Sequence, residues 1–143
     1  MYLSRLHISK FRVFDDITLY FKNGINILIG ENNSGKTAII DALRICLGCG
    51  KPDNFIYVQD GDLHVNPENP SEINTVIQFD LIFEFGDASI ERECFYDFIS
   101  QDKDNPDKQT IQLHLKFIQE NNGKKKYFKR IIWGGDNEGQ QVP

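Results

Sequence analysis

The chain contains, at residues 30–37, the stretch Gly30-Glu31-Asn32-Asn33-Ser34-Gly35-Lys36-Thr37. This stretch fits the phosphate-binding loop pattern G-x-x-x-x-G-K-[ST] without a mismatch. An apolar run at Ile25–Ile29 precedes it and predicts a strand. Apolar residues at helical spacing follow it and predict a helix over about Gly35–Leu47. A strand, a glycine loop and a helix in this order form the context in which such a loop holds phosphate. An accidental match is the alternative, and this context makes it the weaker one.

Each conserved position of the pattern has an expected role in holding a nucleoside triphosphate. Gly30 and Gly35 allow backbone conformations that turn amide N–H groups inward. The helix N-terminus adds unpaired N–H groups and the positive end of its dipole. Lys36 is expected to reach the terminal phosphates, and Thr37 to place its hydroxyl on a magnesium ion. The candidate nucleotide-binding residues of the loop are therefore Gly30, Asn32, Asn33, Ser34, Gly35, Lys36, Thr37 and Ala38.

Composition limits the remaining possibilities. The chain has 143 residues, which suggests one domain, and it is 40% hydrophobic with 11 Phe, enough for a modest core. Its net charge of −5 does not by itself indicate nucleic-acid binding. No apolar run reaches membrane-spanning length and no secretory signal opens the chain, so we expect a cytoplasmic protein without a membrane partner. Cys46 and Cys49 form a lone C-x-x-C, which we interpret as ordinary thiols rather than as a metal or redox site.

The rest of the chain predicts mostly antiparallel strands. Alternation of apolar and polar residues predicts strands at 2–9, 17–22, 73–85, 111–117 and 127–133. Asn23-Gly24 predicts a tight hairpin turn into the strand at 25–29, and 51–71 reads as a loop. A short helix is expected from Asp87 or Ser89 to about Ser100. The fold class is therefore α/β, or α+β within this chain: a P-loop NTPase lobe with an N-terminal β-hairpin, a P-loop strand and helix, and an antiparallel β region.

The order of these elements resembles a known family. Leu6-His7-Ile8-Ser9-Lys10-Phe11-Arg12-Val13-Phe14 is similar to the opening "I-x-N-F-R-x-F" of the SMC, RecF and OLD branch of ABC-type ATPase heads, with Lys10 in place of the usual Asn. The loop at 30–37 and Asp41-Ala42-Leu43 extend this resemblance, which covers about the first 48 residues. It implies ATP and Mg²⁺ as ligands and places Arg12 near the nucleotide or on a DNA-sensing surface. Without the resemblance, Arg12 would be read as a solvated charge.

The resemblance also shows which parts of such a head this chain lacks. Hydrolysis in these heads needs an apolar strand ending in Asp-Glu, and a Leu-Ser-Gly-Gly-Gln-like signature. We reject Val76–Asp80 as that strand, because Gln78 interrupts it and Leu81 replaces the Glu. The resemblance therefore implies a single N-terminal lobe over 1–143, with a P-loop unit at 1–48 and a β-rich arm at 72–133. It implies partnership with the remaining lobe and with a second head. The catalytic residues are unknown, and the lobe alone should be inactive.

Three functions remain open at this point. The leading one is ATP binding as part of an OLD-like ATP-dependent DNA endonuclease. The alternative is a RecF- or SMC-like ATPase in which ATP gates DNA binding or assembly without nuclease chemistry. A free-standing P-loop kinase or switch is the third. DNA is a possible partner of the parent protein. The five cations around the predicted hairpin at 123–130 are read first as protection of an edge strand, and second as a phosphate-backbone contact.

Overall fold

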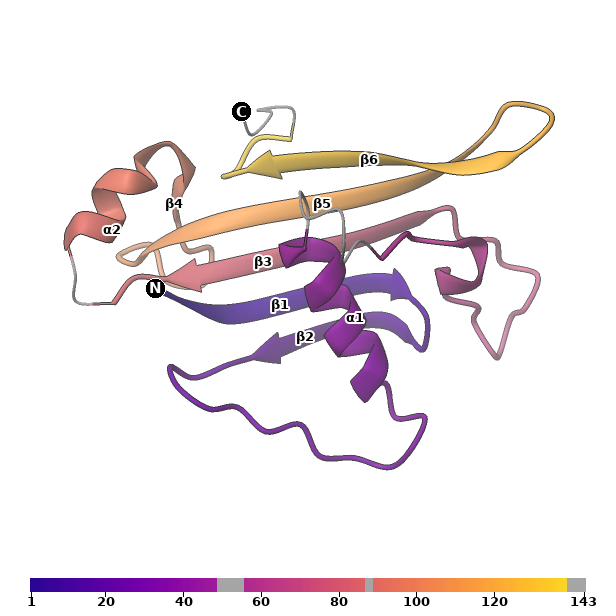
Figure 1. Cartoon of the computed structure of the whole chain (residues 1–143), viewed down its shortest axis with the longest axis horizontal. Coiled ribbons are helices and arrows are strands. Elements are labelled where there is room, and N and C mark those ends of the chain that lie inside the picture. Colours follow the sequence, from indigo (N-terminus) through magenta and orange to yellow (C-terminus); the bar gives the residue numbers. More distant parts are fainter. Residues whose placement is uncertain (49–55, 87–88, 139–143) are drawn as a thin grey trace.

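One antiparallel sheet with a helix on one face makes up most of the chain (Figure 1). The computed structural model describes residues 1–48, 56–86 and 89–138. Its strands are β1 (Tyr2–Phe11), β2 (Phe14–Tyr20), β3 (Val76–Glu84), β4 (Ile99–Gln101), β5 (Gln109–Asn121) and β6 (Lys126–Gly134). Its helical elements are α1 (Lys36–Leu47), α2 (Ser89–Cys94) and the 3-10 turns η2 (Asp60–Asp62) and η3 (Tyr96–Phe98). The expected fold class, a mixed α and β lobe with a large antiparallel region, is confirmed.

The strands follow the order β2-β1-β3-β5-β4, and every neighbouring pair is antiparallel. β6 shares the edge of β5 with β4, because β4 pairs with the first residues of β5 and β6 pairs with the rest. β1 belongs to the predicted P-loop unit and β3 to the predicted β-rich arm. The two segments are therefore joined in one sheet through the β1–β3 pairing.

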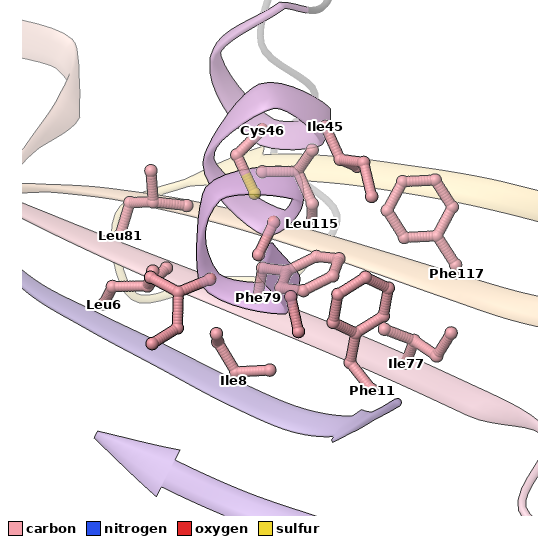
Figure 2. Packing of buried hydrophobic residues seen from close by; sticks show 13 residues of the cluster. Leu6, Ile8, Phe11, Ile45, Cys46, Ile77, Phe79, Leu81, Leu115 and Phe117 are labelled. Atoms are coloured by element: carbon pink, nitrogen blue, oxygen red, sulfur yellow. The ribbon is translucent and has the colours of Figure 1, made fainter. Parts of the chain in front are cut away.

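The core lies between the sheet and α1 (Figure 2). Alternate residues of the central strands point to this face, as period-two burial requires. They are joined by the buried stripe of α1, and the cluster comprises Leu6, Ile8, Phe11, Ala38, Ile39, Ala42, Ile45, Cys46, Ile77, Phe79, Leu81, Leu115 and Phe117. Phe79 lies edge-on to Phe11 at 5.1 Å and to Phe117 at 6.1 Å between ring centroids. Cys46 is thus a core residue, while Cys49 lies outside the described residues.

The strand predicted at Ile25–Ile29 is wrong for this chain. The segment between β2 and α1 carries no strand in the described structure, so Asn23-Gly24 closes no hairpin (Figure 1). Ile25, Ile27 and Ile29 are 93%, 77% and 92% exposed. An apolar run predicts burial, but a strand also needs a neighbour for its backbone hydrogen bonds, and the described sheet offers none at this segment.

The helix predicted through Ser100 is also wrong in its extent. α2 ends at Cys94, and Ile99–Gln101 instead form β4 along β5. Phe98 lies so close to Gly134 that an added Cβ there would be 2.4 Å from the Phe98 ring. Tertiary pairing and packing therefore override the local helical pattern. Asp87 lies outside the described residues, and the predicted loop at 51–71 contains η2.

Candidate phosphate-binding site

Gly35 joins the loop to α1, and both its backbone conformation and its close neighbours favour a residue without a side chain. Its φ is 100°, in the left-handed region, and it is the N-cap residue of α1. A Cβ added there would lie 2.3 Å from the Phe14 ring and 2.9 Å from Val13 Cγ1. The turn between β1 and β2 therefore packs directly against the start of the helix. This contact fixes the loop against the sheet.

The first turn of α1 presents unpaired donors. No side chain caps the helix at Gly35, and the first backbone bond runs from the Ile39 N–H to the Gly35 carbonyl at 3.0 Å. The N–H groups of residues 36–38 consequently have no partner within the helix. Such a helix start attracts an anion through these donors and through the helix dipole.

Lys36 folds back over the loop. Its Nζ donates to the Gly30 carbonyl and, at 3.2 Å, to the Glu31 carbonyl. The ammonium group therefore lies over the concave side of the loop, where it was expected to meet phosphate. Gly30 has no left-handed φ, contrary to the expectation from its place in the pattern. Its role is close packing instead, because an added Cβ would lie 2.6 Å from Ser34 Oγ.

The loop and the end of β1 surround one hollow of about 600 Å³. This volume accommodates part of a nucleotide. Most of the predicted site residues line it: Arg12, Asn32, Asn33, Gly35, Lys36, Thr37 and Ala38, together with Val13 and Glu31. Thr37 is exposed, so its hydroxyl is accessible for a magnesium ion. Gly30 and Ser34 belong to the loop but do not line the hollow.

Arg12 is tied to two carboxylates that the sequence did not single out as its partners. Its Nη1 donates to Asp41 Oδ2 on α1 at 2.6 Å, and its Nε donates to Asp62 Oδ1 in η2 at 2.8 Å. Burial acts to lower the pKa of Arg12, but the hydrogen bonds to Asp62 and Asp41 outweigh it and raise the pKa. Arg12 therefore stays charged and connects β1, α1 and η2 beside the loop.

Backbone contacts reinforce this connection. The Arg12 N–H donates to the Asp62 carbonyl at 2.7 Å, and His64 Nδ1 lies 2.8 Å from the Arg12 carbonyl. Lys10 and Arg12 have φ values of 58° and 51°, which are uncommon for residues with a side chain. His64, which received no role from the sequence, thus helps to hold a strained turn at the edge of the hollow.

Asp80 lies elsewhere, as expected from the rejection of Val76–Asp80 as a catalytic strand. β3 is antiparallel to both β1 and β5, and Asp80 does not line the hollow. Its carboxylate accepts from His7 Nδ1 at 2.7 Å, from His114 Nδ1 at 2.5 Å and from Gln78 Nε2 at 2.9 Å. Burial would raise the pKa of Asp80, but the hydrogen bonds from His114, His7 and Gln78 lower it to about 2.

The residues present fit a phosphate group with a magnesium ion. The fit rests on a glycine whose Cβ would collide with the adjoining turn, on unpaired N–H groups at the start of α1, and on Lys36 lying over the loop. Lys36 and the first-turn amides would hold phosphate oxygens, and Thr37 would supply a ligand for magnesium. Among the described residues, no group of three or more His, Cys, Asp or Glu side chains could hold a metal ion without phosphate.

Comparison with known proteins gives the class. The model of a family described as "AAA domain" matches residues 5–143, and the chain belongs to this family. About a third of the chain is similar to the DNA replication and repair protein RecF of Limosilactobacillus reuteri, with 42% identity over 45 residues. It is also similar to the DNA double-strand break repair Rad50 ATPase of Thermoplasma volcanium, with 40% identity over 47 residues.

The similarity to these relatives covers only a small part of each. The RecF match spans 32% of this chain and 12% of RecF, and the Rad50 match spans 33% of this chain and 5% of Rad50. A solved structure from work on ATP-driven dimerization and DNA-stimulated activation of SMC ATPases shares the fold, with a TM-score of 0.55 at 16% identity. That match covers 99% of this chain and 71% of the solved chain. In the described parts of the chain, no helix is both long and apolar enough to span a membrane.

Proposed function

We propose that this chain binds ATP with Mg²⁺ through its Walker A loop, as the phosphate-binding lobe of a RecF-, Rad50- or SMC-like ATPase head. The observation that carries the proposal is the convergence of Lys36, Thr37 and Arg12 on one hollow at the start of α1. Lys36 and the amides of the first helical turn bind the phosphates, and Thr37 ligates magnesium. Arg12 positions the end of β1 beside the phosphates through its carboxylate partners.

A second lobe completes the head in this proposal. The exposed Ile25, Ile27 and Ile29 form an apolar stretch without a strand partner among the described residues. A strand that this second lobe supplies would satisfy their backbone groups and cover their side chains. That lobe would also bring the Asp-Glu pair and the signature segment, which the sequence of this chain lacks. Two heads would then close over ATP as a homo-oligomer and engage DNA.

The RecF- and SMC-like alternative is better supported than the OLD-like endonuclease that we expected first. The relatives are described as a DNA replication and repair protein and a DNA double-strand break repair ATPase, and the solved structure that shares the fold comes from work on SMC ATPases. We therefore propose that ATP gates assembly or DNA binding in the parent protein, without nuclease chemistry in this lobe.

Titration with a fluorescent ATP analogue in the presence of magnesium tests the binding step. We expect saturable binding by the chain, loss of about tenfold or more in affinity for Lys36→Ala, and a smaller loss for Thr37→Ala at saturating magnesium. Removal of magnesium with a chelator should erase the difference between Thr37→Ala and the unchanged chain. Lys22→Ala is the matched control, because Lys22 is exposed and does not line the hollow. Equal affinity of the Lys36→Ala variant and the unchanged chain would overturn the proposal.

A further inference from the structure

The hairpin of β5 and β6 extends past the rest of the sheet. The last residue of β5 that pairs with β3 is Ile118, which faces Val76, the first residue of β3. The hairpin continues through the rungs Glu120–Tyr127 and Asn121–Lys126 to the turn at 122–125 (Figure 1). We call residues 119–130, which are this projecting end together with Lys129 and Arg130 beside it, the hairpin arm.

The hairpin arm is strongly basic in an acidic chain. It carries Lys124, Lys125, Lys126, Lys129 and Arg130 against one acidic residue, Glu120, while the whole chain has a net charge of −5. All five cations are exposed. Among the described residues, no ion pair neutralises the four lysines. Glu120 accepts a hydrogen bond from the Tyr127 hydroxyl at 2.6 Å. Edge protection accounts for lysines on an edge strand, but a cluster of exposed lysines also creates a positive potential that attracts an anionic partner.

An aromatic groove adjoins these cations on the side of the sheet that α1 covers. Cross-strand pairs share a face, so Arg130 opposite Phe117 and Phe128 opposite Gln119 point to that side. A hollow of about 790 Å³ lies there between the hairpin and the segment at 56–61. Its lining includes Tyr57, which is 70% exposed, and the half-buried Phe128, with Lys126 and Arg130. Phe117 also lines it but is only 7% exposed. Asp60 also lines it and accepts a hydrogen bond from Gln119 Nε2 at 2.6 Å, so its carboxylate is partly satisfied.

We propose that the hairpin arm and this groove form a binding site for single-stranded nucleic acid. Lysines of the arm contact backbone phosphates, and bases enter the groove and stack against Tyr57 and Phe128, which is how sequence-tolerant single-strand sites are built. A duplex would offer phosphates but no free base faces for the groove. The site is separate from the loop at 30–37, because the two hollows share no lining residue.

Fluorescence anisotropy of the full chain with a labelled oligothymidylate of about 20 nucleotides, longer than one site of this kind, tests the proposal. We expect Lys124→Glu/Lys125→Glu to bind about tenfold more weakly or worse. We also expect Lys124→Ala/Lys125→Ala to lower the slope of log affinity against log salt by about 1.4, which is about 0.7 for each lost phosphate contact. The control Lys22→Glu/Lys103→Glu makes the same change in net charge at exposed lysines outside the hairpin arm and should bind as the unchanged chain does.

Two further variants separate stacking from charge and this site from the nucleotide site. Phe128→Leu keeps an apolar side chain and should weaken oligothymidylate binding several-fold while leaving binding to a labelled duplex unchanged. Because Phe128 packs against the core, its unfolding curve is measured alongside to show that the variant is folded under the binding conditions. Lys36→Ala should bind oligothymidylate normally, so failure of the ATP proposal would not be mistaken for failure here. The proposal is overturned if the control pair loses as much affinity as the arm pair, if the duplex binds as tightly as the single strand, or if neither binds.

Discussion

At the scale of single residues, Gly35 has the most demanding environment in the loop. It combines a left-handed φ with a contact to Phe14 and Val13 that leaves no room for a side chain. Gly24 has a similar φ of 108° but nothing within 4 Å of an added Cβ. A side chain at Gly24 would therefore cause backbone strain alone, whereas a side chain at Gly35 would cause the same strain and a steric overlap.

Alanine substitutions at the two glycines measure how much each effect lowers the free energy of unfolding. We expect Gly24→Ala to lower the free energy of unfolding by about 1 kcal/mol, from backbone strain alone. Gly35→Ala should cost about 2–4 kcal/mol, because the overlap with Phe14 adds to the same strain. Urea unfolding of both variants is the measurement. If both variants lowered the free energy of unfolding equally, the turn between β1 and β2 would be able to move away from the added methyl group and would not fix the loop.

Asp80 and its two histidines predict how stability depends on pH. The pKa of Asp80 is lowered to about 2, so its contribution is present above the unfolded value of 3.8 and is lost as pH falls toward 2. For His7, burial acts to lower the pKa, but the hydrogen bonds to Asp80 and Asp16 outweigh it and raise the pKa. Its contribution is therefore present below 6.5 and is lost as pH rises through the raised value.

The variant Asp80→Asn isolates this effect. We expect the unchanged chain to exceed it in unfolding free energy by about 2 kcal/mol near pH 6, since one pKa unit corresponds to about 1.4 kcal/mol. The advantage should shrink as pH falls from 3.8 toward 2, and again as pH rises from 6.5 through the raised pKa of His7. Urea unfolding across this range is the test. A constant difference at all pH values would contradict the coupling of Asp80 with its histidines.

At the scale of elements, Ile25–Ile29 is an apolar segment whose isoleucine side chains are exposed and whose backbone pairs with no described strand. Its side chains contribute no burial here, so Ile25→Thr/Ile27→Thr should change the unfolding free energy of this chain by less than about 0.5 kcal/mol. Ile8→Ala, at a fully buried position, should cost about 2–5 kcal/mol by comparison. In the longer parent protein that we propose, the same threonine pair should be strongly destabilising, because the proposed second lobe would bury the segment there.

Thermal unfolding of both proteins provides the comparison. A large cost of Ile25→Thr/Ile27→Thr in the short chain would show that the segment is already buried without a second lobe. A negligible cost in the parent protein would show that no lobe covers it. Either result would remove the structural support for a divided head.

The same elements show what sequence can and cannot predict. Five of the strands were predictable, because alternation of apolar and polar residues indicates both a strand and the face that it buries. These strands are β1, β2, β3, β5 and β6. The helix after Thr37 was predictable for the same reason at helical spacing. The structure of Ile25–Ile29 could not be predicted in this way, because an apolar run predicts burial but does not identify the element that would bury it. β4 was missed because its pairing depends on β5, which follows it in the chain.

The site divides in a similar way. Lys36, Thr37 and Gly35 could be proposed from sequence because the loop is local, and the structure places all three around one hollow. The partners of Arg12 were not, because Asp41 and Asp62 lie 29 and 50 residues away. Asp41 stood inside the matched family segment, which was a usable signal. Asp62 had none.

At the scale of the whole molecule, the fold consists of one sheet and one core helix with the phosphate loop at one edge. All the described strands are antiparallel, whereas a P-loop enzyme that works alone usually places its loop after a central parallel strand. This arrangement is consistent with our proposal that the chain is one lobe of a divided ATPase head, in which the loop would bind phosphate and another lobe would supply the groups that activate water.

Magnesium-dependent ATP turnover by this chain, beside the longer parent protein, tests that account most directly. We predict that the chain binds ATP in a Lys36-dependent manner without turnover, and that the parent protein hydrolyses ATP at a rate that Lys36→Ala abolishes. Turnover by the short chain that disappears in Lys36→Ala would contradict the account, because this lobe would then contain its own water-activating residue.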